Sequence, residues 1–142
     1  MIADWIRPSS CVGVNGEACP KAIDGNTATY YEAPKSGSIL FDLGSTRLVN
    51  GVELWKHSNA KDNGIKSVTI STSLDKNSFS EQKKQTSVYK PGTNNFEHFL
   101  LYTTVSARYV RVDFTNYGNP RGKPYTSFWS VKVRTVAATG WN

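Results

Sequence analysis

The sequence predicts an all-β domain built as an antiparallel sandwich or barrel. Several short segments alternate apolar and polar residues, which is typical of strands that bury one face. Clusters of Gly, Pro and Asn separate these segments, and no segment of a dozen residues carries the apolar period of a helix. These three observations favour a sheet protein whose binding loops gather at the ends of its strands.

Six segments are expected to form strands, and turn residues separate them. Within them, Val68 and Ile70 should face the core, as should Val131 and Val133 near the end of the chain. Four irregular segments are expected to be loops. We place the domain at residues 1–135 and a tail or linker remnant at 136–142. The expected strands are 38–43, 49–54, 68–73, 96–102, 108–114 and 128–135, and the expected loops are 5–22, 56–66, 86–95 and 116–125.

Length, composition and charge bound the kind of protein. The chain has 142 residues, 38% of them hydrophobic, which suits one domain with a real core. No apolar run approaches the roughly 20 residues of a membrane helix, and no signal peptide is visible. The net charge of +6 indicates either a solvated basic surface or an anionic partner, such as an acidic polysaccharide or an anionic membrane. No nucleic-acid-binding motif is present, so a nucleic-acid partner is not expected.

Two cysteines, Cys11 and Cys19, lie close together in SSCVGVNGEACPK. Their spacing fits neither Cys-x-x-Cys redox chemistry nor a complete zinc site. We expect a loop disulfide in an exported protein; the alternative is a pair of reduced thiols in a cytosolic one.

Catalysis is hard to assemble from this sequence. The histidines are His57 in a loop and His98 in an expected strand, and neither adjoins a nucleophile motif. His98 is expected to be a surface strand residue. We therefore predict that the domain is not an enzyme.

The turn around Gly25 offers oxygen ligands of the kind that Ca²⁺ prefers. Asp24, Asn26 and Thr29 lie within one short stretch, and Gly25 lets the backbone fold back so that carbonyls can join them. The alternative interpretation is an ordinary Asp-Gly-Asn turn without a metal.

Sugar binding requires an aromatic platform and a few fixed hydrogen-bonding groups. The expected loops and strand ends carry both, although Tyr31 and Trp55 adjoin strands and should be buried. The candidates are Trp5, Tyr30, Tyr31, Trp55, His57, Asn59, Tyr117, Asn119, Arg121 and Tyr125.

Five segments occur in a characteristic order: AIDGNTATYY, ILFDLG, VTISTSLDKNSF, SARYVRVDF and FWSVKV. Together they make the chain resemble a discoidin-type domain. This is the galactose-binding-like fold shared by coagulation factor V/VIII C-type domains and family 32 carbohydrate-binding modules. The resemblance covers residues 9–134 and implies an eight-stranded antiparallel jelly-roll β-sandwich with ligand loops at one end.

The resemblance also implies a structural Ca²⁺. Its ligands would be Asp24, Asn26 and Thr29, together with the backbone carbonyls of Lys21 and Trp129. A Glu is usual in the last strand, and here that position is Ser130. Asp24 is then the single charged ligand, so Ca²⁺ is expected to bind weakly or not at all.

The sugar-binding relatives place an aromatic before the last strand, where this chain has Tyr125. By the same resemblance His57 and Asn59 would read hydroxyls, and Glu32 stands where a His is frequent. The loop from Tyr30 to Lys35 would be aimed at the ligand. The cations Lys35, Lys56 and Arg121 would favour acidic sugars.

The sequence therefore predicts a non-catalytic carbohydrate-binding module of a secreted or cell-surface protein. It would tether a multidomain parent to a glycan, of galactose type or an acidic polysaccharide. The alternative is a discoidin-type adhesion domain that binds protein or anionic phospholipid. The loop tips are polar, so no membrane insertion is expected.

Overall fold

The computed structural model describes residues 2–26, 28–33, 36–56, 65–86, 95–116, 126–128 and 130–137. In this part of the chain the regular structure is antiparallel strands and two single-turn 3₁₀ helices, which confirms the all-β prediction. No described helix is long and apolar enough to cross a membrane. The elements are β1 (Ile2–Ile6), β2 (Ser10–Val12), η1 (Val14–Gly16), η2 (Pro20–Ala22), β3 (Tyr31–Ala33), β4 (Gly37–Lys56), β5 (Ile65–Ser73), β6 (Ser80–Thr86), β7 (Asn95–Asn116), β8 (Thr126–Phe128) and β9 (Ser130–Ala137).

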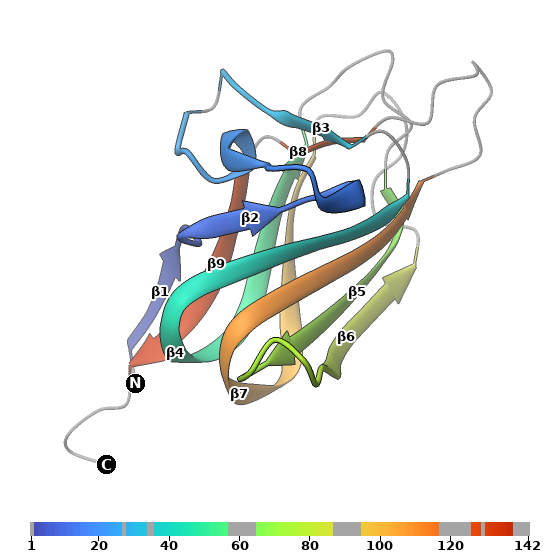
Figure 1. Cartoon of the computed structure of the whole chain (residues 1–142). Helices are drawn as coiled ribbons and strands as arrows, with labels where there is room; N and C mark the ends of the chain where they lie inside the picture. Colours follow the sequence, from blue (N-terminus) through green and yellow to red (C-terminus); the bar gives the residue numbers. More distant parts are fainter. Residues whose placement is uncertain are drawn as a thin grey trace.

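The two longest strands, β4 and β7, each run through both layers of the sandwich (Figure 1). The first part of β4 pairs with β2 and with the end of β7, which in turn pairs with β5. The second part of β4 pairs with β9 and with the start of β7. Strands β1 and β6 lie at the two edges, in the order β1-β9-β4-β7-β5-β6, and β3 pairs with β8 separately.

A half-exposed ion pair between Asp42 and Arg108 stabilises β4 where the strand changes layer. Gly44 adopts φ +85° at the irregularity after Asp42, a conformation that favours glycine. The Asp42 carboxylate accepts hydrogen bonds from the Gly44 amide (2.8 Å) and from Arg108 Nε (3.0 Å) and Nη2 (3.2 Å). Arg108 lies in β7 opposite this irregularity, between Ala107 and Tyr109, which pair with Arg47 and Asp42. One carboxylate therefore joins the two strands where their pairing is interrupted.

The core lies between the two layers and contains residues from each. Phe41 and Val112 come from one layer, and Phe99 and Val133 from the other, and all four are fully buried. Val68, Ile70 and Val131 are also buried, as the alternation predicted. The sequence pattern therefore identified the inward faces correctly.

The sequence pattern missed the continuity of the long strands and several short ones. Segments 38–43 and 49–54 are parts of β4, and 96–102 and 108–114 are parts of β7. Segment 5–22 was expected to be a loop, but it contains the end of β1 and all of β2. Strand β6 (SEQKKQT) is an edge strand with no buried residue, so it shows no apolar alternation.

The last strand extends past the expected domain boundary. Strand β9 ends at Ala137, and Val136 is buried and pairs with Ala3 of β1. Val136 also pairs with Leu48 of β4, so the last strand is held on both sides beyond residue 135. The division into a domain and a tail stays a prediction.

Neighbouring residues of β7 offer a matched test of the core. Phe99 is 0% exposed and Leu100 is 55% exposed. We expect Phe99→Ala to lower the free energy of unfolding by roughly 3–5 kcal/mol, since it leaves a large cavity. Leu100→Ala should change it by less than about 0.5 kcal/mol. Denaturant unfolding of both variants measures the difference, and equal losses would contradict this placement of the core.

The Asp42–Arg108 pair predicts a pH dependence of stability. Arg108, with the Gly44 amide, lowers the pKa of Asp42 below its ordinary 3.8. Asp42 therefore contributes stability above the ordinary pKa, and this is lost as the pH falls through the folded-state pKa. We expect Asp42→Asn to lower Tm by about 2–5 °C at neutral pH and by much less at acidic pH. An equal loss at both pH values, measured by thermal unfolding, would refute the ionic contribution.

Candidate functional site

The Asp-Gly-Asn turn is closed by its own hydrogen bonds. Asp24 Oδ1 accepts from the Asn26 amide (2.9 Å), and Asp24 Oδ2 accepts from Thr29 Oγ1 (2.6 Å). Asn26 Oδ1 accepts from the Ala28 amide (2.9 Å). The Thr29 hydroxyl, followed by the Asn26 amide, lowers the pKa of Asp24, so its carboxylate stays ionised at neutral pH. The turn thus fixes the start of the segment that leads into β3.

Gly25 and Arg7 pack closely in this turn. Gly25 has φ +73°, and a Cβ placed on it would lie 2.9 Å from Arg7 Nη1. A side chain at this position would therefore collide with the guanidinium, in addition to straining the backbone. This contact could not be predicted, because Arg7 lies in a segment that was expected to be irregular.

The predicted disulfide is confirmed between Cys11 and Cys19, whose Cα atoms are 5.2 Å apart. The loop that it closes is also held by main-chain pairing: the Cys19 amide donates to the Cys11 carbonyl, and Val12 bridges Ala18. The chain then enters η2, so the residues on both sides of Cys19 have a fixed course. Disulfides persist in oxidising compartments, which fits an exported protein.

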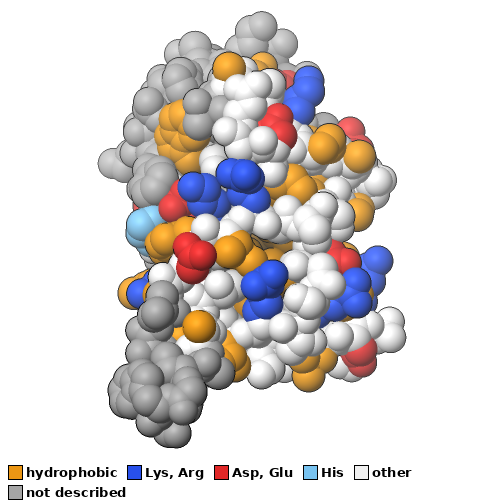
Figure 2. Space-filling view, turned by 90° about the vertical axis from the view of Figure 1, so that its left-hand side faces the viewer, with side chains coloured by type: hydrophobic (Ala, Val, Ile, Leu, Met, Phe, Trp, Pro, Cys, Tyr) orange, Lys and Arg blue, Asp and Glu red, His pale blue; other side chains and the backbone are white. Residues whose placement is uncertain are grey.

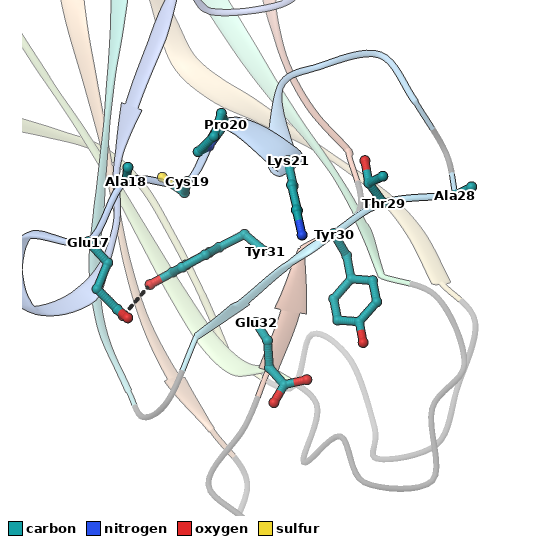
Figure 3. Close-up of a pocket in the computed structure, with 10 residues that line it drawn as sticks. All are labelled: Glu17, Ala18, Cys19, Pro20, Lys21, Ala28, Thr29, Tyr30, Tyr31 and Glu32. Atoms are coloured by element: carbon teal, nitrogen blue, oxygen red, sulfur yellow. Dashed lines mark hydrogen bonds between the residues drawn. The ribbon is translucent and has the colours of Figure 1, made fainter.

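A pocket of about 690 Å³ lies between this disulfide loop and the segment that leads into β3 (Figure 3). One wall runs from Glu17 to Lys21, and the other from Ala28 to Glu32. In Figure 3 the Lys21 side chain extends from η2 toward the opposite wall. The volume lies within the range of about 300–1,000 Å³ typical of small-ligand pockets.

The side chains of Tyr30, Tyr31 and Glu32 point alternately to opposite sides of the segment that enters β3. Glu32 is exposed and Tyr30 half-buried, and both project from the same side of the segment (Figure 3). Tyr31 points the other way, is 7% exposed and donates a hydrogen bond to Glu17 Oε1 (3.0 Å). This alternation follows from strand geometry, in which successive side chains face opposite sides. The expectation of burial is confirmed for Tyr31, whereas Trp55, for which it was also made, is only half-buried.

The structure brings together part of the predicted ligand set. Tyr30 and Glu32 line the pocket with Thr29 and Lys21, two residues that had been predicted as metal ligands. Glu17 was not predicted, since its role depends on the fold of the disulfide loop. The predicted residues outside the described part of the chain are Lys35, His57, Asn59, Tyr117, Asn119, Arg121, Tyr125 and Trp129, and the side chain of Lys56.

The Asp-Gly-Asn turn offers few free ligands to the Ca²⁺ that the resemblance implies. Asp24 is the one carboxylate of the turn, and both of its oxygens already accept hydrogen bonds within it. In the residues that the structure describes, no group of three or more His, Cys, Asp or Glu side chains could hold a metal. Ser130 supplies no charge in the last strand. The described residues therefore fit Ca²⁺ poorly, because ligand charge sets its affinity.

His98 lies on the sheet, outside this pocket. Its Nε2 is 3.0 Å from Glu53 Oε2, and its ring stacks on Trp5 at 4.5 Å. Glu53 alternates in β4 with Val52 and Leu54, which face the core, so its side chain faces outward. It is nevertheless buried, because His98 and Trp5 cover it. The prediction that His98 is a surface strand residue is confirmed.

The chain belongs to the F5/8 type C domain family, whose model matches residues 6–130. The chain matches none of the curated protein sequences. Among solved structures, the family 32 carbohydrate-binding module of AlyQ in complex with 4,5-unsaturated mannuronic acid is 28% identical. Its TM-score is 0.69, with 92% of this chain and 97% of that chain covered.

Two further structures are similar. A truncated AlyQ with carbohydrate-binding and alginate lyase domains is 27% identical, with a TM-score of 0.72 and 97% of this chain covered. The present chain spans only 34% of its length. A chitosan-binding module from a chitosanase/glucanase of Paenibacillus sp. IK-5 is 28% identical, with a TM-score of 0.60 and 94% and 92% coverage. The sandwich fold and the family are thereby established.

The calcium question has a direct test in the last strand. We expect Ca²⁺ or a chelator to shift the Tm of the wild-type protein by less than about 1 °C, since weak binding stabilises little. Ser130→Glu should introduce a Ca²⁺-dependent rise in Tm, whereas Ser130→Gln, which has a similar size but no charge, should not. A large chelator-dependent fall in the wild-type Tm would contradict the expectation.

Proposed function

We propose that this domain is a non-catalytic carbohydrate-binding module that tethers a secreted or cell-surface parent protein to a glycan. The proposal depends mainly on one observation: Tyr30, Glu32 and Lys21 line the same pocket. An aromatic ring offers a face for the C–H side of a sugar, while carboxylate and ammonium groups bind its hydroxyls. The AlyQ module in complex with 4,5-unsaturated mannuronic acid and the chitosan-binding module from Paenibacillus support the same class of ligand.

An acidic glycan suits the charge of the chain better than a neutral one. The net charge of +6 attracts polyanions over distances longer than a contact. Lys21 supplies a cation inside the pocket itself. A galactose-type sugar, which the family resemblance suggests, is the neutral alternative. Salt separates the two, because screening weakens the binding of a uronate and leaves that of a neutral sugar nearly unchanged.

The rival function is an adhesion domain that binds anionic phospholipid, and the same positive charge favours it. Figure 2 shows basic, acidic and hydrophobic side chains interspersed on the face that it presents, without one continuous basic patch. Such mixing suits a glycan pocket better than a charged membrane surface. Sedimentation with phosphatidylserine vesicles tests this rival directly. Vesicle binding in the absence of any glycan binding would favour it.

The Tyr30 ring provides the sharpest test of the proposed function. We expect Tyr30→Ala to weaken glycan binding roughly tenfold, because a stacked ring contributes about 1 kcal/mol beyond its buried area. Tyr102→Ala is the matched control, since Tyr102 is 62% exposed on β7 and does not line the pocket. Titration calorimetry would use mannuronate, galactose-terminated and glucosamine oligosaccharides. Equal affinities of the two variants for the bound oligosaccharide would exclude Tyr30 as the platform.

A further inference from the structure

We propose that the disulfide loop, residues 11–19, forms a specificity-determining wall of the glycan pocket, with Glu17 and Lys21 as its ligand-reading groups and Tyr31 as the residue that positions it. The inference rests on the proposed function and deepens it. It adds to the site a segment of this chain that lies before the Asp-Gly-Asn turn and is closed by its own cysteines.

The wall is continuous with the disulfide. Five consecutive residues, from Glu17 to Lys21, line the pocket, and Cys19 lies in the middle of them. Cys19 itself is 1% exposed and Cys11 is 8% exposed, so the covalent link is anchored in the core. The disulfide bond and the burial of its two cysteines therefore hold the pocket wall in place, while the side chains that face outward remain accessible.

Tyr31 connects this wall to the opposite one. Its hydroxyl accepts a hydrogen bond from the Val14 amide (3.0 Å) and donates one to Glu17 Oε1 (3.0 Å). Burial, followed by the hydrogen bond to Glu17, raises the pKa of Tyr31 to about 12, so its hydroxyl remains a donor throughout the physiological range. Glu17 is thereby held at the end of the wall by a residue of β3.

Gly13 allows this arrangement. A Cβ at Gly13 would lie 2.5 Å from the Tyr31 hydroxyl oxygen and 2.9 Å from Cε2 of its ring. Any other residue would push the ring away from the loop. The Gly13 amide also donates to the Glu17 carbonyl, so the loop is tied on both sides of Val14. The loop and β3 are therefore fitted to each other closely.

The charges on the two walls define the kind of ligand. Glu17 and Lys21 stand at the ends of one wall, and Glu32 stands on the other. Carboxylates accept hydrogen bonds from sugar hydroxyls, and an ammonium group donates to a sugar carboxylate. Glu32 projects from the side of its segment opposite to Tyr31 and Glu17 (Figure 3), so the disulfide-loop wall reads the ligand through Glu17 and Lys21. This wall suits a sugar that turns a hydroxyl toward Glu17 and a carboxylate toward Lys21. A uronic acid has this chemistry.

Conservative variants of the wall test the inference through the ratio of two affinities. Mannuronate and galactose-terminated oligosaccharides serve as the charged and neutral probes in titration calorimetry. Lys21→Met should weaken mannuronate binding roughly fivefold to tenfold, as expected for a lost charge-assisted hydrogen bond, with little change for the neutral probe. Glu17→Gln, which keeps an acceptor for Tyr31, should shift the ratio toward mannuronate. A merely structural effect would weaken both probes equally.

The positioning role of Tyr31 and the disulfide has a separate readout. Tyr31→Phe and the Cys11→Ser/Cys19→Ser double variant, each confirmed as folded by near-UV circular dichroism, should bind mannuronate at least roughly fivefold more weakly. Tyr102→Phe is the matched control, because its hydroxyl also accepts a main-chain hydrogen bond, from the Lys84 amide (3.2 Å), away from the pocket. Reducing agent should weaken the wild type as well, and reoxidation should restore its affinity.

The outcomes distinguish this inference from the function on which it rests. Binding by the wild type with unchanged affinity and unchanged probe ratio in all the wall variants would overturn the inference and leave the proposed function standing. Failure of the wild-type protein to bind any of the oligosaccharides would overturn both.

Discussion

One ion pair, Asp42 with Arg108, joins β4 and β7 at the irregularity in their pairing. Strands β4 and β7 run through both layers of the sandwich, so their course determines how the layers face each other. The Asp42 carboxylate binds the Gly44 amide within its own strand and Arg108 across the sheet. These two residues lie in the segments ILFDLG and SARYVRVDF, which supported the family resemblance. The ion pair between these two residues is therefore a structural reason why both segments occur in one chain.

The candidate site depends on this β-sandwich, although neither Asp42 nor Arg108 lines the pocket. The sandwich fixes β3 through its pairing with β8, and the stacking of Tyr31 and Phe128 anchors β3 against the core. The disulfide loop then packs on the opposite side of Tyr31. A rigid β-sandwich thus carries a pocket whose walls are short, irregular segments, which is the usual division between scaffold and binding loops.

The Asp-Gly-Asn turn has a structural role in this arrangement. Its hydrogen bonds and the Arg7 contact fix the direction in which the chain enters β3, and so the side on which Tyr30 and Glu32 project. In the relatives that the sequence resembles, a cation is expected to stabilise this turn. Here both carboxylate oxygens of Asp24 accept hydrogen bonds within the turn, and the pocket proposed for the ligand lies next to it.

Alternation and turn residues by themselves determined the fold class and the inward faces of the main strands, and the resemblance of five short segments indicated the family. Each of these depends on local periodicity or on short segments of the chain. The candidate ligands Tyr30 and Glu32 and the disulfide were also identified from the sequence. Only the tertiary structure joined the separate segments into β4 and β7, paired Asp42 with Arg108, and placed Glu17 against Tyr31. These contacts join residues that are distant along the chain, such as Asp42 and Arg108, or depend on the course of an irregular loop. Neither leaves a periodic signal in the sequence.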